Sequence, residues 1–308
     1  MPEPAALRQL RLDGGPADGS RLIEVANAAG LTVDLLPDRC LDLGQVRLNG
    51  VPFGWVGPNG LAPAAPGEMD QALGGLMCTC GFDHIRQPEA QGGRRYPLHG
   101  SMSLRKAQVE AACVGPDGSA EIRARVAHGV AGGASWTLLR RITIPADRAE
   151  IAIEDEVALH APAEGDRVMA LYHVNLGPPL VGADTVVSVA GQPRPDLPGS
   201  APGTFCEPAP PGATVVEVGR GIGDARVLFR LEAAADQLPW LQFHRRIAPD
   251  GGLFCVEPAT HDRRLRTELA PDGPGPEGNV LRRFRLLLRF GHEVPSAPER
   301  SGQTLSGP

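Results

Sequence analysis

Short runs of apolar residues, punctuated by glycine and proline, follow one another along the whole chain. The runs that alternate in polarity or are rich in β-branched residues predict strands at Leu22–Val25, Leu31–Leu36, Ala120–Val126, Ser135–Ile144, Glu150–Leu159, Val168–Val174, Arg226–Leu231, Leu253–Val256 and Val280–Phe290. No long segment combines apolar residues at helical spacing with capping residues at both ends. The pattern therefore predicts an all-β fold of large antiparallel sheets.

A hairpin and several loops refine this expectation. The segment Arg140–Leu159 is typical of two long strands joined by a turn at Pro145–Arg148. Stretches rich in proline and glycine predict surface loops or a lid over a cleft at Val56–Gly67, Gly191–Pro211 and Ala270–Gly278. No repeat of fixed period is present. We expect one β-sandwich domain over residues 1–294 and a disordered tail over 295–308.

Composition and charge narrow the classes of function. The net charge of −6 gives no basic surface of the kind that nucleic acids or anionic membranes attract. The N-terminus has no signal-peptide core, and no stretch approaches the roughly 18 apolar residues of a membrane span, so a cytoplasmic protein is expected. Six scattered cysteines predict reduced thiols, and Cys78-Thr79-Cys80 is better explained as small side chains on a strand than as a metal motif.

Two histidines and one glutamate stand in contexts that present a side chain. His99 precedes Gly100, which permits close approach of another group. His173 ends an apolar run, where alternation places Tyr172 on one face and His173 with Asn175 on the other. A single strand histidine is more often structural than catalytic. Glu257, an acid at the end of the apolar run Leu253–Val256, is the companion that favours acid–base chemistry.

These contexts belong to a series of five motifs: Leu36–Gly44, Cys78–Asp83, Leu98–Gly100, Tyr172–Asn175 and Val256–Ala259. In this order the series resembles the aldose 1-epimerase (galactose mutarotase-like) superfamily, and most closely a bacterial branch of uncharacterised members. The resemblance spans about residues 20 to 290. It implies a large antiparallel β-supersandwich with a sugar held in a cleft on one face.

The resemblance also implies roles for individual residues. His173 corresponds to the general acid, Glu257 to the general base, and His99 to the residue that orients a hydroxyl. Further sugar-binding positions are expected at Arg39, Asp83, His84 and Asn175. Two positions depart from the branch, since Cys40 replaces a glycine and His84 replaces an asparagine.

The implied reaction is the exchange of α and β anomers, with Glu257 and His173 acting from opposite sides of a pyranose. A small sugar is the expected partner, no metal is required, and no nucleotide cofactor is expected because no phosphate-binding loop precedes a helix. Whether the chain forms a homodimer is left open. Two other functions are also left open. One is a metal-assisted isomerase, epimerase or lyase in which His84, His99, His173 and Glu257 bind the ion. The other is a non-catalytic carbohydrate-binding protein, which the aromatic content of 4% disfavours.

Overall fold

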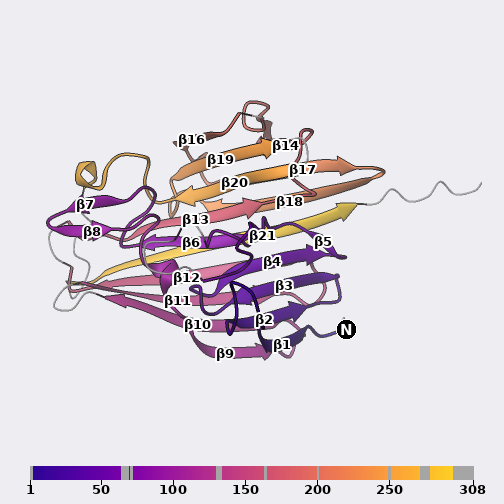
Figure 1. Ribbon diagram of the computed structural model, residues 1–308, viewed down its shortest axis with the longest axis horizontal. Helices are drawn as coiled ribbons and strands as arrows, with labels where there is room; N and C mark the ends of the chain where they lie inside the picture. The colour runs from indigo at the N-terminus through magenta and orange to yellow at the C-terminus, as the bar shows by residue number, and fades with distance from the viewer. Residues whose placement is uncertain are drawn as a thin grey trace, which may run out of the picture.

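Two large antiparallel sheets form the body of the molecule in the computed structural model (Figure 1). The structure describes residues 3–63, 69, 72–129, 134–162, 165–199, 201–248, 251–270 and 278–293. The expected tail 295–308 and most of the expected loop Ala270–Gly278 lie outside these residues. None of the helices in the described part of the chain has the length and apolar character that a membrane span requires.

The first sheet holds the strands that matter for function. Its order is β1 (Ala6–Arg11), β2 (Arg21–Ala26), β3 (Leu31–Leu36), β4 (Asp42–Leu48), β6 (Met77–Phe82), β13 (Met169–Leu176), β20 (Gly251–Ala259), β19 (Trp240–Ala248) and β16 (Gly203–Pro208), with β5 (Val51–Pro52) paired to β4. Strand β13 thus lies inside the sheet, between β6 and β20.

The second sheet is formed largely from the middle and the end of the chain. Its order is β15 (Gln192–Pro193), β14 (Val186–Val189), β17 (Ala213–Ile222), β18 (Ala225–Ala234), β21 (Val280–Glu293), β12 (Glu150–His160), β11 (Ser135–Ile144), β10 (Ala120–Gly129) and β9 (Gln108–Val114). A small hairpin of β7 (Glu89–Gln91) and β8 (Arg94–Tyr96) and two 3-10 turns, η2 (Met102–Leu104) and η3 (Arg266–Glu268), complete the described elements. Edge strands β1 and β9 contact each other at the bottom of Figure 1.

The all-β architecture expected from the sequence is confirmed, and each expected strand overlaps an observed one. The expected hairpin is β11 and β12, in which Ile142 pairs with Ile153. Buried and partly exposed residues alternate along all of β12. This alternation arises because one face packs on the core and the other faces solvent.

One loop prediction was wrong. The segment Gly191–Pro211 contains β15 and the edge strand β16, which pairs with β19. An edge strand needs hydrogen bonds on one side only, so the prolines around β16 do not prevent pairing. Strand β6 escaped the pattern analysis for another reason. All six of its residues are buried, so it has no polar face to reveal a strand period.

Apolar side chains cover both faces of the first sheet near its centre. Its inner face and the second sheet enclose the main core, which includes Trp136, Tyr172 and Phe254. A smaller apolar cluster, including Cys80, Met169 and Leu171, packs on the opposite face. Neighbouring residues of β13 therefore enter different environments, and those on the outer face can take part in a site.

Candidate active site

Three adjacent strands present polar side chains on the outer face of the first sheet. Asn175 of β13 pairs with Cys255 of β20, and Gln242 of β19 pairs with Glu257 of β20. Because side chains two residues apart share a face, His173, Asn175, Cys255, Glu257, Gln242 and His244 all point to this side. The strand register alone brings together residues that lie more than 80 positions apart in the sequence.

Asn175 fixes the tautomer of His173. The Asn175 side-chain amide donates to the Leu73 carbonyl at 2.7 Å, which leaves its oxygen facing His173 Nδ1 at 2.5 Å. Since an amide oxygen only accepts, His173 Nδ1 must carry the hydrogen. The free nitrogen, Nε2, is then the atom that gains or loses a proton, and it points into the site.

Glu257 faces this nitrogen with an oxygen that has no other partner. Glu257 Oε1 lies 3.5 Å from His173 Nε2 and makes no hydrogen bond to any residue that the structure describes. The second oxygen, Oε2, accepts a hydrogen bond from Gln242 at 2.5 Å, and Gln242 in turn accepts one from Arg86 at 2.8 Å. Glu257 is fully buried. One oxygen is thus held in place while the other remains available to a ligand.

His99 approaches the pair from a tight turn. Its own φ is +58°, and that of Gly100 is +77°. A Cβ at Gly100 would lie 2.2 Å from the His84 carbonyl oxygen, so only glycine fits, as the sequence suggested. The His99 ring stands edge-on to that of His173 with 5.2 Å between centroids. Burial, reinforced by the neighbouring His173 and Arg86, holds the pKa of His99 well below its usual value, so this imidazole is neutral at pH 7.

Asp83 supports that turn from behind. Its carboxylate accepts hydrogen bonds from the Ser101 backbone nitrogen at 2.8 Å and from the Ser101 hydroxyl at 2.9 Å. Burial alone would raise the pKa of Asp83, but the His128 ring 3.6 Å away and the bonds from Ser101 lower it below its usual range. Asp83 is therefore ionised at neutral pH and anchors the chain two residues after His99.

A cavity of about 280 Å³, which we call the inner cavity, lies over these groups. Its lining includes His99, His173 and Glu257, the three residues that the sequence singled out, together with Arg86, Gln242 and His244. A second cavity of about 710 Å³ adjoins it, since His244 and Leu253 line both. Trp55 is among the residues that line this larger cavity. The inner cavity has room for a monosaccharide next to the histidine–glutamate pair.

The other expected sugar-binding residues lie outside this lining. Arg39 is buried and donates to the Gly74 carbonyl at 2.7 Å. His84 hydrogen-bonds with the Gln87 carbonyl at 2.6 Å and lines another adjoining cavity of about 150 Å³, which shares Arg86 and Arg263 with the inner cavity. Asp83 and Asn175 support His99 and His173 from behind. His173 and Glu257, expected on opposite sides of a sugar, come from adjacent strands and share one wall of the cavity.

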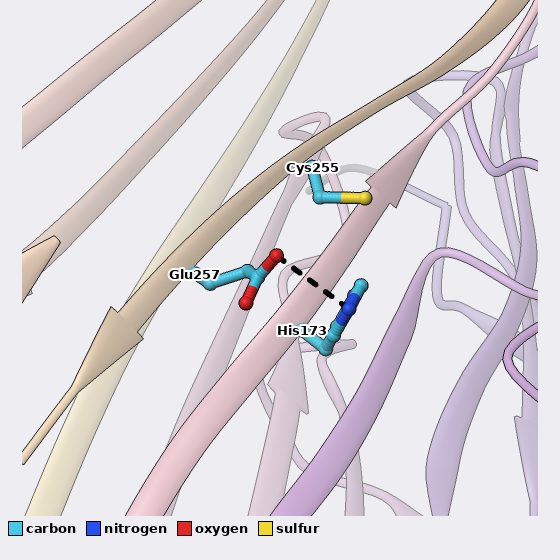
Figure 2. Close-up of side chains that lie close together, drawn as sticks. All are labelled: His173, Cys255 and Glu257. Carbon is cyan, nitrogen blue, oxygen red and sulfur yellow. Dashed lines mark ion pairs between the residues drawn. The ribbon is translucent and has the colours of Figure 1, made fainter. Parts of the chain in front are cut away.

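His173, Cys255 and Glu257 form a set that could ligate a metal ion. Their ligand atoms all lie within 4.8 Å of one another, and Figure 2 shows the three side chains grouped beside β13 and β20. The neighbourhood opposes a thiolate, however. Burial, with a further contribution from the charge of Glu257, raises the pKa of the Cys255 thiol well above its usual value.

Several polar lining residues, including Gln242, His244, Arg86 and Arg263, were not found from the sequence. Gln242 and His244 alternate with the buried Leu241 and Phe243 in β19, so a period of two would have placed them on one face. Arg86 left no such signal. It lies in the segment after β6 with a φ of +69°, and only the tertiary fold brings it to β19.

Comparisons with known proteins identify the family to which the chain belongs. The sequence profile of a domain of unknown function, DUF4432, matches residues 17–201, which include His99 and His173 but end before Glu257. No curated protein matches the chain.

Several solved structures share the fold at low sequence identity. A "putative aldose 1-epimerase" from Klebsiella pneumoniae has a TM-score of 0.67 at 18% identity, covering 93% of this chain and 83% of that one. A GalM/aldose epimerase homologue from C. elegans has a TM-score of 0.52 at 15% identity, covering 90% and 100%. A galactose 1-epimerase from Lactobacillus acidophilus has a TM-score of 0.51 at 11% identity, covering 93% and 99%. The chain therefore belongs to the DUF4432 family and has the β-sandwich fold of aldose 1-epimerase-like and galactose mutarotase-like proteins.

Proposed function

We propose that the protein is an aldose 1-epimerase, which exchanges the α and β anomers of a sugar by acid–base catalysis. The observation that carries the proposal is the buried pair of His173 Nε2 and Glu257 Oε1, 3.5 Å apart at the wall of a cavity of monosaccharide size. The names of the structural neighbours, aldose and galactose epimerases, agree with this chemistry but support only the fold.

The geometry suits the reaction because the two oxygens that exchange protons are bonded to the same sugar carbon. Glu257 removes the proton of the anomeric hydroxyl while His173 Nε2–H protonates the ring oxygen, and the C1–ring oxygen bond breaks to give the open aldehyde. After rotation about C1–C2, the ring closes and each proton returns to its source. An acid and a base on one wall can therefore reach both oxygens together, without flanking the sugar.

His99 has the properties of a positioning group for the sugar. It is neutral, and its Nδ1 is buried without a hydrogen-bond partner in the described part of the chain. A neutral imidazole can donate from one nitrogen and accept at the other. In this proposal His99 binds a sugar hydroxyl or the ring oxygen next to the proton of His173.

A metal-assisted sugar isomerase is the second candidate, favoured by the spacing of His173, Cys255 and Glu257. A divalent ion held by these atoms would polarise a sugar carbonyl or hydroxyl. The acid–base reaction is preferred because the Cys255 thiol already donates a hydrogen bond to the Asn175 oxygen at 3.4 Å and because Asn175 leaves His173 Nε2 free to carry a proton.

Anomer exchange measured by saturation-transfer NMR on a panel of aldoses tests the proposal. The wild type should accelerate exchange equally with and without a chelator, and Glu257→Gln should lose on the order of 10²–10⁴-fold, since an amide cannot accept the proton. Glu156→Gln, which removes the same charge on the partly exposed face of β12, is the matched control and should keep full activity. Loss of activity on chelation would favour the metal candidate, whereas binding without exchange would contradict both.

A further inference from the structure

Positive charge is concentrated at the cavity of a protein that is acidic overall. Among the described residues that line the inner cavity, Arg86 and Arg263 are permanently charged cations, and Glu257 is the one acid. The chain as a whole carries a net charge of −6. A neutral sugar needs no such excess, so the two arginines call for a separate explanation.

Arg86 is a half-buried guanidinium whose hydrogen bonds go to neutral groups. It donates to the carbonyls of His261 and Asp262 at 2.7 and 2.5 Å and to the Gln242 amide oxygen at 2.8 Å. No carboxylate within the described ranges forms an ion pair with it. The nearby Asp262 carboxylate is held by Arg264 at 2.8 Å.

Arg263 adds a second unpaired cation at the same cavity. Its side chain is exposed at the cavity lining, and the described residues contain no ion-pair partner for it. Burial lowers the pKa of Arg86; the positive charge of Arg263 acts in the same direction, while the charges of Glu257 and Asp262 act against it. Neither guanidinium lies at ion-pair distance from a carboxylate of the described residues, so an anionic ligand would supply a contact that the protein itself does not.

We propose that the substrate is an acidic sugar whose carboxylate or phosphate binds between Arg86 and Arg263 while its anomeric carbon lies at His173 and Glu257. This inference rests on the proposed function. All four residues line the one cavity of about 280 Å³, so a single monosaccharide spans both groups. The planar guanidinium of Arg263, which has no hydrogen-bond partner among the described residues, matches the paired oxygens of either anion, and such charge-assisted hydrogen bonds are stronger than those to neutral hydroxyls. Arg86, whose three nitrogens each already donate to a protein acceptor, contributes mainly its positive charge.

Isothermal titration with matched probes tests the inference. The probes are glucose and galactose as neutral sugars, glucuronate and galacturonate as carboxylates, and glucose 6-phosphate as the phosphate. The wild type should bind at least one of the two anionic classes about tenfold or more tightly than the neutral sugars, and high salt should reduce that preference. Arg263→Gln should weaken binding of that anionic sugar about tenfold and alter neutral-sugar binding less than twofold.

Two arginine variants locate the effect. Arg125→Gln removes the same charge from an exposed position of β10 in the other sheet and should bind all probes as the wild type does. Arg246→Gln tests the adjoining larger cavity, which Arg246 lines. Loss of anion binding in Arg246→Gln with no change in Arg263→Gln would overturn the assignment of the site.

The outcomes separate this inference from the proposed function. Neutral sugars that bind and exchange anomers as well as acidic ones would overturn the inference and leave the function intact. Acidic sugars that bind through Arg263 but do not exchange anomers would support the anion site and overturn the function. The preference between carboxylates and phosphate identifies which anion the pair of arginines recognises.

Discussion

Two neighbouring residues of β13, Tyr172 and His173, face opposite sides of the first sheet. Their polar neighbours differ in how completely they are hydrogen-bonded. The Tyr172 hydroxyl donates to Asp155 at 2.7 Å, and the same carboxylate binds Arg140 through two hydrogen bonds of 2.8 and 2.6 Å. Arg140 also donates to the Cys40 carbonyl at 3.2 Å. On this inner face, each of these three side chains has hydrogen-bond partners, and together they join the two sheets.

On the outer face, polar atoms are buried but left without partners. Glu257 Oε1 and His99 Nδ1 make no hydrogen bond to the described residues, although both belong to buried side chains. Burying an unsatisfied polar atom costs on the order of 1–3 kcal/mol. The inner network also holds such an atom, because Asp42, whose Oδ1 lies 3.4 Å from Arg140, has no partner for Oδ2 among the described residues. The difference is that Glu257 and His99 line a cavity, where a ligand can complete their hydrogen bonds.

Replacing His173 should produce the largest effect. His173→Gln removes the proposed acid for the ring oxygen, and anomer exchange should fall on the order of 10²–10⁴-fold. Combining it with Glu257→Gln should cost little more, because the two groups act as a unit. Tyr172→Phe, its neighbour on the inner face, should keep exchange within a few-fold in the same NMR assay. Additive losses would show that His173 and Glu257 act independently.

Breaking the inner network should affect stability instead. Asp155→Asn removes the closer of the two carboxylates that the fully buried Arg140 contacts and leaves it with Asp42 at 3.4 Å, so the free energy of unfolding should fall by about 3 kcal/mol. Urea denaturation measures the change. Replacing both partners by apolar residues, Arg140→Met with Asp155→Leu, should recover only part of the loss, because Asp42 then loses its cation and the Tyr172 hydroxyl its acceptor. A single variant as stable as the wild type would mean that the network is not a structural tie.

Asn175 should show an intermediate effect on activity. Asn175→Ala removes the acceptor of His173 Nδ1, so the imidazole is no longer held in one orientation. The kcat for anomer exchange should therefore fall on the order of tenfold to a hundredfold. Asn175→Asp, which keeps an acceptor at the same place, should retain more activity than the alanine variant. Equal losses in both variants would argue that Asn175 serves packing and not the orientation of the imidazole.

The pH dependence of stability should show the smallest effect. Because burial holds the pKa of His99 well below its usual 6.5, the unfolded chain takes up a proton below pH 6.5 while the folded chain does not. Stability should therefore fall with decreasing pH, by up to about 1.4 kcal/mol per pH unit from this residue. His99→Gln should have a shallower slope between pH 7.5 and 5 in urea titrations. Burial also lowers the pKa values of His84 and His244, which contribute equally to the wild type and to His99→Gln. Identical slopes of stability against pH in the two proteins would therefore exclude His99 as the cause.

The sequence by itself determined the fold class and indicated the residues at the centre of the candidate site. Strands such as β12 have one buried and one partly exposed face, and the resulting period of two is visible in the sequence. The same alternation placed His173 opposite Tyr172, and the polar end of an apolar run marked Glu257. Strands without that contrast were missed, including β6, which is buried on both faces, and the edge strand β16.

Only the tertiary structure decided how these residues are combined. The pairing of β13, β20 and β19 sets Gln242 against Glu257 and brings Arg86 to Gln242 across 156 positions of sequence. It also places Asp83 and Asn175, expected to contact sugar, behind the histidines, and it brings His173 and Glu257, the proposed acid and base, to one wall of the cavity. Such arrangements depend on strand order and register between distant segments, and a local pattern of residues carries no information about either.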